Sequence, residues 1–335
     1  MRAFLERLKD PKPLLYDGGF ATELFYRRIE LPNSAVASVS HPDTVVDIHS
    51  SYLDAGSDVL GTNTFVASVL HLEMAGKDPS EAAEIVKSSV EHARRAIERA
   101  EKGAYVAGVI GPSPGALEAD SGDTEYGIPN VKARDAHARV AEALAGAGVD
   151  FFVLETMFSA KETAIAIDSI RGIGLPIAVS LTYKYTKDRK TGECVYRTDW
   201  GHSAGDMLDI LSFGEFSDGD DLLEDVQILG LNCGAEQIRE EHTGMLYAKI
   251  GIQQLRDAMK ERGINAKRMM CFPNAGIPDL DMKCKVTTYT QTPEVMAPHL
   301  PDLLKEGAYF IGGCCGTQPA HIRSFRESLD ASWKT

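Results

Sequence analysis

The sequence contains no long uninterrupted apolar run, although 44% of its 335 residues are hydrophobic. A helix that spans a bilayer needs about 20 consecutive apolar residues, so we expect no transmembrane helix. Residues 1–15 alternate charged with apolar side chains and lack the continuous apolar segment of a secretory signal. The membrane-spanning class is therefore excluded at the outset.

Positive charge and cysteine are both scarce. Lys and Arg number 35 against 49 Asp and Glu, which gives a net charge of −14. Because an acidic chain is repelled by phosphate backbones and anionic lipids, we expect neither nucleic acid nor a membrane surface as a partner. The six cysteines lack the spacing of a disulfide framework, and this usage predicts a reducing, cytoplasmic location.

Three of those cysteines nevertheless stand in unusual sequence. Cys314 and Cys315 are adjacent within the run IGGCCGT, and Cys233 lies in LNCG. Successive strand residues point to opposite faces, so neighbouring cysteines can serve one site only where glycine frees the backbone. Three thiolates brought together would form a zinc site with an open fourth position, which is the arrangement of a catalytic zinc.

Other interpretations of the cysteines remain open. Cys314 and Cys315 could be small buried hydrophobes, or they could form a vicinal disulfide, which a reducing compartment disfavours. Cys271 lies in the apolar run MMCF and is predicted to be core. Cys194 and Cys284 fall in polar sequence that is typical of loops.

Strand-like and helix-like patterns alternate along the whole chain. Eight short apolar or β-branched runs occupy Pro13–Gly19, Val59–Phe65, Tyr105–Gly111, Phe151–Met157, Pro176–Thr182, Val226–Gly234, Arg268–Gly276 and Tyr309–Thr317. Helical patterns occupy Pro42–Ala55, Glu81–Ala100, Val131–Ala147, Ala160–Arg171, Glu236–Arg262, Pro293–Lys305 and Pro319–Leu329. This alternation predicts an α/β protein with one domain over residues 1–335, a single (β/α)8 TIM barrel.

Chemically distinctive residues fall at the carboxyl ends of these predicted strands. They are Asp17, Thr62, Glu155, Cys233, Asn274, Cys314 and Cys315. In a TIM barrel that rim carries the active site. Their convergence there indicates an enzyme.

The motifs on this rim resemble those of the zinc-dependent homocysteine S-methyltransferase family. They are DGG at 17–19, GTNTF at 61–65, GPS at 111–113, LET at 154–156, NCG at 232–234, PNAG at 273–276 and GGCCGT at 312–317. That family includes the betaine and S-methylmethionine methyltransferases and the homocysteine module of cobalamin-dependent methionine synthase. The resemblance runs from about residue 13 to residue 330.

The resemblance implies that Cys233, Cys314 and Cys315 bind Zn2+ and carry the catalysis. The thiol of homocysteine would take the fourth position on the metal, and its methylation would give methionine. A free thiol is mostly protonated at neutral pH, whereas coordination to zinc deprotonates it.

An amino-acid substrate also needs its polar ends held. Glu155 is the best candidate to pair with the ammonium group, and Asp17 with the adjoining Gly18 resembles the family's second contact to it. Backbone N–H groups of the glycine-rich turn at Gly313 are a candidate site for the carboxylate. Thr62 and Asn274 complete the predicted substrate contacts. Each of the four side chains also has a structural alternative, Glu155 as a carboxylate bonded within the barrel and Asp17 as a turn residue.

The sequence does not identify the methyl donor. Betaine-using members resembled here carry a tryptophan in the segment that matches 31–35, where this chain has Asn33, so one cation–π partner for a quaternary ammonium is missing. Two long rim segments, Tyr183–His202 and Ile277–Thr292, could form a donor site or a dock for a separate methyl-corrinoid protein. The aromatic residues of the first segment could form a donor cage, or they could pack on neighbouring helices; these residues are Tyr183, Tyr185, Tyr196 and Trp200.

Three functional hypotheses follow from these observations. The first is an enzyme that methylates homocysteine from a small onium donor. The second is a catalytic subunit that takes the methyl group from a corrinoid protein. The third is a zinc-binding thiol sensor without turnover.

Overall fold

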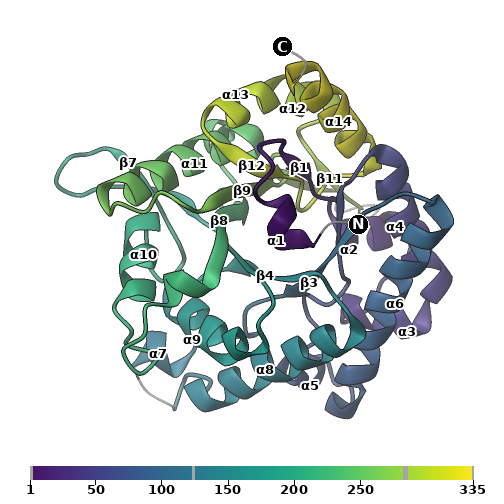
Figure 1. Ribbon diagram of the computed structural model, residues 1–335, viewed down its shortest axis with the longest axis horizontal. Helices are drawn as coiled ribbons and strands as arrows, with labels where there is room; N and C mark the ends of the chain where they lie inside the picture. The colour runs from purple at the N-terminus through teal and green to yellow at the C-terminus, as the bar shows by residue number, and fades with distance from the viewer. Residues whose placement is uncertain (1–2, 123–124, 282–285, 334–335) are drawn as a thin grey trace.

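Eight parallel strands form a barrel, as the sequence predicts (Figure 1). The computed structural model describes residues 3–122, 125–281 and 286–333. The barrel strands are β1 (Leu14–Leu15), β2 (Val59–Gly61), β3 (Tyr105–Ile110), β4 (Phe151–Met157), β5 (Ile177–Leu181), β8 (Val226–Cys233), β9 (Arg268–Pro273) and β12 (Ala308–Ile311). Their order is β1-β12-β9-β8-β5-β4-β3-β2. The two end strands meet where the Asp58 N–H donates to the Leu15 carbonyl at 2.7 Å, and this bond closes the ring.

Helices surround the barrel on its outer face (Figure 1). The larger ones are α4 (Pro42–Ala55), α6 (Ala82–Ala100), α8 (Asn130–Ala147), α9 (Ala160–Ile170), α10 (Ala204–Ser212), α11 (Gly244–Glu261) and α14 (Pro319–Trp333). Shorter ones are α1 (Phe4–Arg7), α2 (Phe20–Tyr26), α3 (Ala37–Ser40), α5 (Val69–Met74), α7 (Glu118–Ser121), α12 (Pro293–Met296) and α13 (Leu300–Lys305). Among the described residues, no helix combines the length and the apolar character needed to cross a membrane.

Among the larger helices, α11 and α10 differ most from the sequence prediction. The helix predicted over Glu236–Arg262 begins only at Gly244, because the Glu236 carboxylate accepts hydrogen bonds from the N–H groups of Ile238 and Arg239 and holds a turn instead. Helix α10 was not predicted. Its signal was present, since Ser203 and Asp206 form a reciprocal capping box at its start.

Aromatic side chains fill the interior of the barrel. Phe4 of α1 stacks on Phe151 with ring centroids 3.8 Å apart, and it meets Phe310 edge-on. Tyr16 stacks on Phe272 at 4.3 Å. Helix α1 lies over the centre of the barrel in Figure 1 and closes its amino-terminal end. Chemistry is therefore restricted to the opposite end of the strands.

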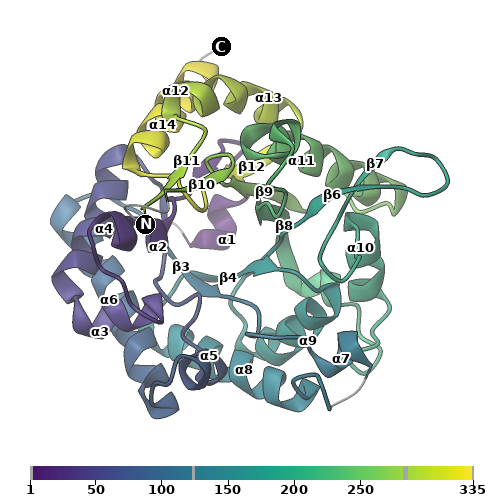
Figure 2. The same cartoon turned by 180° about the vertical axis from the view of Figure 1, so that it is seen from behind.

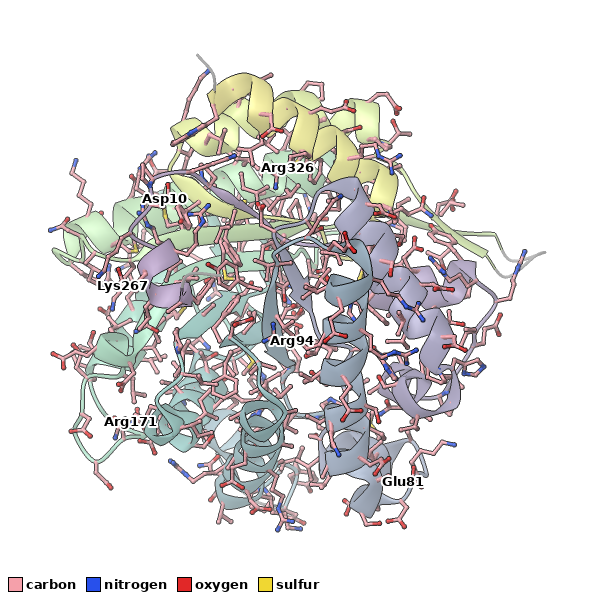
Figure 3. All side chains as sticks on the ribbon, turned by 45° about the vertical axis from the view of Figure 1, so that its right-hand side comes forward. Asp10, Glu81, Arg94, Arg171, Lys267 and Arg326 are labelled. Atoms are coloured by element: carbon pink, nitrogen blue, oxygen red, sulfur yellow. The ribbon has the colours of Figure 1, made fainter. Side chains whose placement is uncertain are left out.

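Ion pairs secure the amino-terminal ends of the strands. Arg326 on α14 donates to the Gly56 carbonyl at 2.8 Å and pairs with Asp58. Arg94 on α6 pairs with Asp150 at 3.0 Å (Figure 3). Asp150 also accepts from the Val106 N–H at 2.7 Å, so Arg94 connects α6 to the sheet. Arg326 connects α14 to the sheet in the same way.

Two antiparallel hairpins extend the carboxyl-terminal rim, within the segments that the sequence predicts as long (Figure 2). One joins β6 (Lys184–Lys187) to β7 (Cys194–Arg197), and the other joins β10 (Pro278–Asp281) to β11 (Val286–Tyr289). Cys194 is thus the first residue of a strand rather than a loop residue. Cys284, predicted in a loop, lies outside the described residues.

Candidate active site

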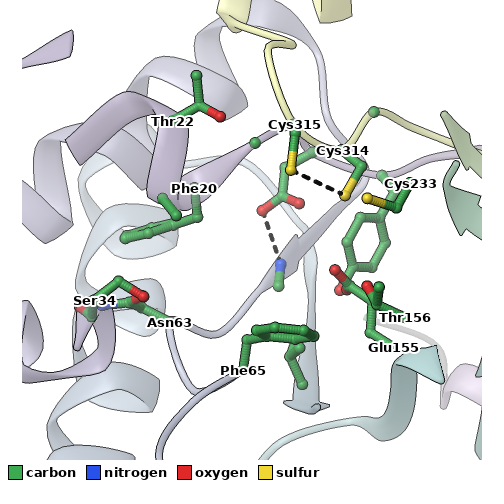
Figure 4. A pocket seen from close by; sticks show the side chains of 18 of the residues that line it. Phe20, Thr22, Ser34, Asn63, Phe65, Glu155, Thr156, Cys233, Cys314 and Cys315 are labelled. Carbon is green, nitrogen blue, oxygen red and sulfur yellow. Dashed lines mark hydrogen bonds between the residues drawn. The ribbon is translucent and has the colours of Figure 1, made fainter. Parts of the chain in front are cut away.

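Three cysteine sulfurs come together at the carboxyl-terminal rim (Figure 4). Cys233 ends β8, while Cys314 and Cys315 lie in the turn that follows β12. The three sulfurs lie within 4.8 Å of one another, and those of Cys314 and Cys315 are 4.0 Å apart. Tetrahedral zinc with Zn–S bonds of 2.3 Å separates its sulfur ligands by about 3.8 Å. This donor set therefore fits a zinc ion.

Unusual backbone conformations place these sulfurs. Cys233 has a φ of 58°, in the left-handed region that non-glycine residues rarely adopt. The Cys314 N–H donates to the Pro273 carbonyl at 2.9 Å, and the Cys315 N–H donates to Asn274 Oδ1 at 3.0 Å. The turn is thereby anchored to the end of β9. Strained backbone of this kind is typical of functional sites.

The three thiols share their protons before a metal binds. The pKa of the Cys315 thiol is lowered because the thiols of Cys233 and Cys314 hydrogen-bond to it. Hydrogen bonds with Cys233 and Cys315, followed by burial, raise the pKa of the Cys314 thiol well above its usual value. One thiolate thus forms readily and the next does not, so a divalent cation that replaces the remaining protons would stabilise the cluster.

A cavity of about 220 Å3 opens in front of the sulfurs. Its walls are Tyr16, Asp17, Gly18, Gly19, Phe20, Ala21, Thr22, Ser34, Gly61, Thr62, Asn63, Phe65, Val109, Glu155, Thr156, Cys233, Gly313, Cys314 and Cys315. None of these wall residues is Lys, Arg or His, whereas two are carboxylates and three are cysteines. The described walls therefore favour cationic groups.

Glu155 places an unpaired carboxylate in this cavity. It follows Leu154 at the end of β4, next to Thr156, whose φ of 59° turns the strand. Among the described residues, none donates a hydrogen bond to the Glu155 carboxylate. Burial, followed by the nearby Cys315, raises its pKa to about 7. In the part of the chain that the structure describes, Glu155 thus has no hydrogen bond that would give it the alternative role of a structural carboxylate within the barrel.

Asp17 contributes the second carboxylate. Its Oδ2 accepts from the Gly61 N–H at 2.8 Å, and its side chain is 3% exposed. Burial raises its pKa, and the neighbouring Glu155 adds to that rise. Asp17 thus links β1 to β2 and also faces the cavity, so its turn role and a substrate contact are compatible.

The other predicted substrate contacts have different surroundings. Gly18 lines the cavity, and its N–H has no acceptor among the described residues, whereas the Gly313 N–H donates to the Asp17 carbonyl at 3.0 Å. The Thr62 hydroxyl accepts from the Val109 N–H at 3.0 Å and contacts Thr64 Oγ1 at 2.7 Å, within the wall. Asn274 is not a wall residue and supports the cysteine turn. Contacts of Gly313, Thr62 and Asn274 with a substrate stay predictions.

Sequence reasoning missed three residues of the site. Asn232 is fully buried and holds Thr156 and Cys314. Its place beside Cys233 in the NCG motif was the available signal. Thr156 stood in the LET motif at 154–156, whereas Tyr289 had no such signal, because its place against Gly316 depends on a hairpin.

The aromatic residues of Tyr183–His202 divide into two groups. Tyr183 and Tyr196 are buried, and Tyr185 stacks on His242 at 4.2 Å, so these three tyrosines pack as the alternative predicts. Trp200 is 38% exposed and lines a neighbouring cleft, whose wall includes Phe65 and Thr156 of the main cavity.

Asn33, the residue in the segment 31–35 where a tryptophan was expected for betaine use, has a structural role. Its Nδ2 donates to the Val66 carbonyl at 2.8 Å, and its Oδ1 accepts from the Ala35 N–H at 2.9 Å. Aromatic faces come instead from Phe20 and Phe65, which lie across the cavity from Cys233 (Figure 4).

Three clustered cysteines and two carboxylates on the carboxyl-terminal rim of a TIM barrel are features of an enzyme that activates a thiol. Residues 14–329 match the sequence model of the family described as homocysteine S-methyltransferase. The chain therefore belongs to the homocysteine S-methyltransferase family.

Solved structures with the same fold include the homocysteine methyltransferase MmuM from Escherichia coli. Its metallated form is 22% identical, with a TM-score of 0.70 over 97% of this chain and 99% of that one. Its oxidized form is 23% identical, with a TM-score of 0.67 over 97% and 98% of the two chains. At these identities the likeness supports the TIM barrel alone.

Proposed function

We propose that the protein transfers a methyl group from a small onium donor to the thiol of homocysteine and forms methionine. The observation that carries this proposal is the cavity itself. Three clustered sulfurs face a wall whose described residues include no cationic side chain, and this wall contains the unpaired Glu155 carboxylate. A thiol, an ammonium group and an onium donor all suit these surroundings.

Zinc bound by Cys233, Cys314 and Cys315 would supply the Lewis acidity that keeps a substrate thiol deprotonated at neutral pH. Three thiolate ligands leave such a centre with a net negative charge, which suits a nucleophilic sulfur. The fit of the sulfur separations to tetrahedral zinc supports this assignment.

Protein groups hold the amino-acid end of the substrate. Glu155 pairs with the ammonium, and Asp17 adds a second negative charge close to it. The free N–H of Gly18 is available to the substrate carboxylate. Together these contacts would orient the thiol toward the three sulfurs and position it for attack.

In the transfer step the substrate sulfur attacks the methyl carbon and a new S–C bond forms. The bond from that carbon to the onium atom breaks, and its electron pair stays with the donor, which leaves neutral. Phe20 and Phe65 line the cavity as aromatic side chains that suit the cationic donor before transfer. A cavity of about 220 Å3 is of a size that suits a small onium donor.

Parallel assays of three donors test the proposal. Zinc-loaded protein and homocysteine are incubated with S-methylmethionine, betaine or methylcobalamin, and methionine is measured, with Cys314→Ala as the inactive control. Methionine from an onium donor supports the proposal. Turnover with methylcobalamin alone would favour the corrinoid-linked subunit, and zinc binding without any methionine would favour a thiol sensor.

A further inference from the structure

Tyr16 forms the floor of the main cavity. It follows β1, is 3% exposed, and belongs both to the aromatic cluster that fills the barrel and to the cavity wall. Its backbone N–H donates to the Ile311 carbonyl at 2.8 Å. Its ring stacks on Phe272 at 4.3 Å and lies 5.7 Å from the ring of Phe310. The ring is therefore held in place, and so is the direction in which its hydroxyl points.

The Tyr16 hydroxyl is buried and has no hydrogen-bond partner among the described residues. A buried polar group that is left unpaired costs about 1–3 kcal/mol. Tyr309 is equally exposed, at 3%, but lies at the closed end of the barrel, where its hydroxyl bonds to the carbonyls of Arg7 and Asp10, both at 3.0 Å. An unpaired hydroxyl on the cavity floor thus indicates a contact that a bound molecule completes.

The absence of a side chain at Gly61 lets this hydroxyl approach the end of β2. A Cβ at position 61 would lie 2.6 Å from Tyr16 Oη, so only glycine permits the contact. The N–H of the same glycine donates to Asp17 Oδ2 at 2.8 Å. Gly61 therefore holds the Tyr16 hydroxyl and the Asp17 carboxylate at the same part of the cavity wall.

The charges around the Tyr16 hydroxyl are negative. Burial, followed by the charges of Asp17 and Glu155, raises its pKa well above the usual value for tyrosine, so the hydroxyl stays neutral. A neutral hydroxyl has lone pairs that accept hydrogen bonds, and a primary ammonium group has three N–H donors. Two carboxylates and one hydroxyl on this wall supply an acceptor for each of the three.

We propose that the Tyr16 hydroxyl is the third acceptor of the ammonium site, beside Glu155 and Asp17, and makes that site selective for a primary ammonium group. A group without N–H donors, such as a methylated onium, would leave the buried hydroxyl unpaired, and a site built to form a hydrogen bond rejects such a ligand. The site would therefore take the amino-acid thiol rather than the donor, although both are cationic. The inference rests on the proposed function, because it requires an amino-acid thiol in this cavity.

The binding of two thiols to zinc-loaded protein tests the inference without methyl transfer. Homocysteine carries the ammonium group, whereas 4-sulfanylbutanoate has the same carbon chain, thiol and carboxylate but no nitrogen. Isothermal titration calorimetry measures both dissociation constants for wild type, Tyr16→Phe and the control Tyr309→Phe. Tyr16→Phe keeps the ring on Phe272 and removes only the hydroxyl. Tyr309→Phe is a matched control because it removes an equally buried hydroxyl at the closed end of the barrel.

Tyr16→Phe should bind homocysteine about tenfold more weakly than wild type and 4-sulfanylbutanoate as tightly, so the preference for the ammonium-bearing thiol falls about tenfold. Tyr309→Phe should leave both constants unchanged. Equal weakening for the two thiols in Tyr16→Phe would show a structural role and overturn the inference, as would an unchanged constant for homocysteine. Failure of the proposed function is a separate result, because homocysteine that binds without forming methionine in the donor assays would refute only the methyl transfer.

Discussion

Asn232 holds Thr156 by two hydrogen bonds. Its Oδ1 accepts from the Thr156 N–H at 2.9 Å, and its Nδ2 donates to Thr156 Oγ1 at 2.7 Å. Thr156 follows Glu155 and has a φ of 59°, while Asn232 precedes Cys233, whose φ is 58°. One buried amide therefore joins β4, which presents the Glu155 carboxylate, to β8, which presents the Cys233 sulfur.

Asn232→Asp should weaken metal retention. The change keeps the shape and the acceptor of the side chain, but it removes the donor to Cys314 and adds a buried negative charge beside the thiolates. We expect a chelator to remove zinc from this variant at least about tenfold faster than from wild type. A factor of this size corresponds to the loss of about one charge-assisted hydrogen bond. Asn33→Asp is the control, since it adds the same charge at a buried amide that bonds the Val66 carbonyl. Equal rates of zinc loss in the two variants would contradict the proposed role.

Glu155→Gln should raise the KM for homocysteine and leave zinc in place. Glutamine keeps the size of the side chain and removes the charge that pairs with the ammonium, a bond of roughly 1.5–3 kcal/mol. An increase in KM of at least about tenfold is expected from steady-state kinetics. If the KM did not change, Asp17 would become the main ammonium contact.

The same carboxyl should make stability depend on pH in the ligand-free protein. The pKa of Glu155 is raised to about 7 from an ordinary value near 4.5, mainly by burial. The folded state therefore binds a proton that the unfolded state has released, and the free energy of unfolding falls as pH rises between these two values. The slope from this group is about 1.4 kcal/mol per pH unit at most. Urea unfolding of metal-free protein measures it, and Glu155→Gln should flatten the profile over that window.

Removal of the metal should abolish activity without unfolding the barrel. The hydrophobic core clusters of the described residues do not include Cys233, Cys314 or Cys315, so we expect the barrel to fold without the metal. After chelation, circular dichroism should stay close to that of the loaded protein while activity is lost. Cys314→Ala should bind no zinc, whereas Cys194→Ala, on the hairpin, should bind it stoichiometrically. Equal zinc loss from both variants would refute the ligand assignment.

The sequence alone was sufficient to predict the features whose positions depend on where the strands end. The glycine-flanked cysteines, Asp17 and Glu155 follow apolar runs, so a barrel places them on one rim. Features that depend on tertiary register were not accessible. The packing of Tyr289 against Gly316 requires the β10–β11 hairpin, which produces no periodic pattern in the sequence.

Trp200 should affect the methyl donor rather than the thiol. It lines a cleft that shares Phe65 and Thr156 with the main cavity, whereas Tyr185 of the same segment stacks on His242. We expect Trp200→Ala to raise the KM for an onium donor several-fold, because an exposed cation–π contact contributes about 0.5–1 kcal/mol. Zinc content and the KM for homocysteine should not change, and Tyr185→Ala serves as the matched control. If both variants used every donor as well as wild type, the segment Tyr183–His202 would be structural, and donor selection would depend on Phe20 and Phe65 at the inner wall.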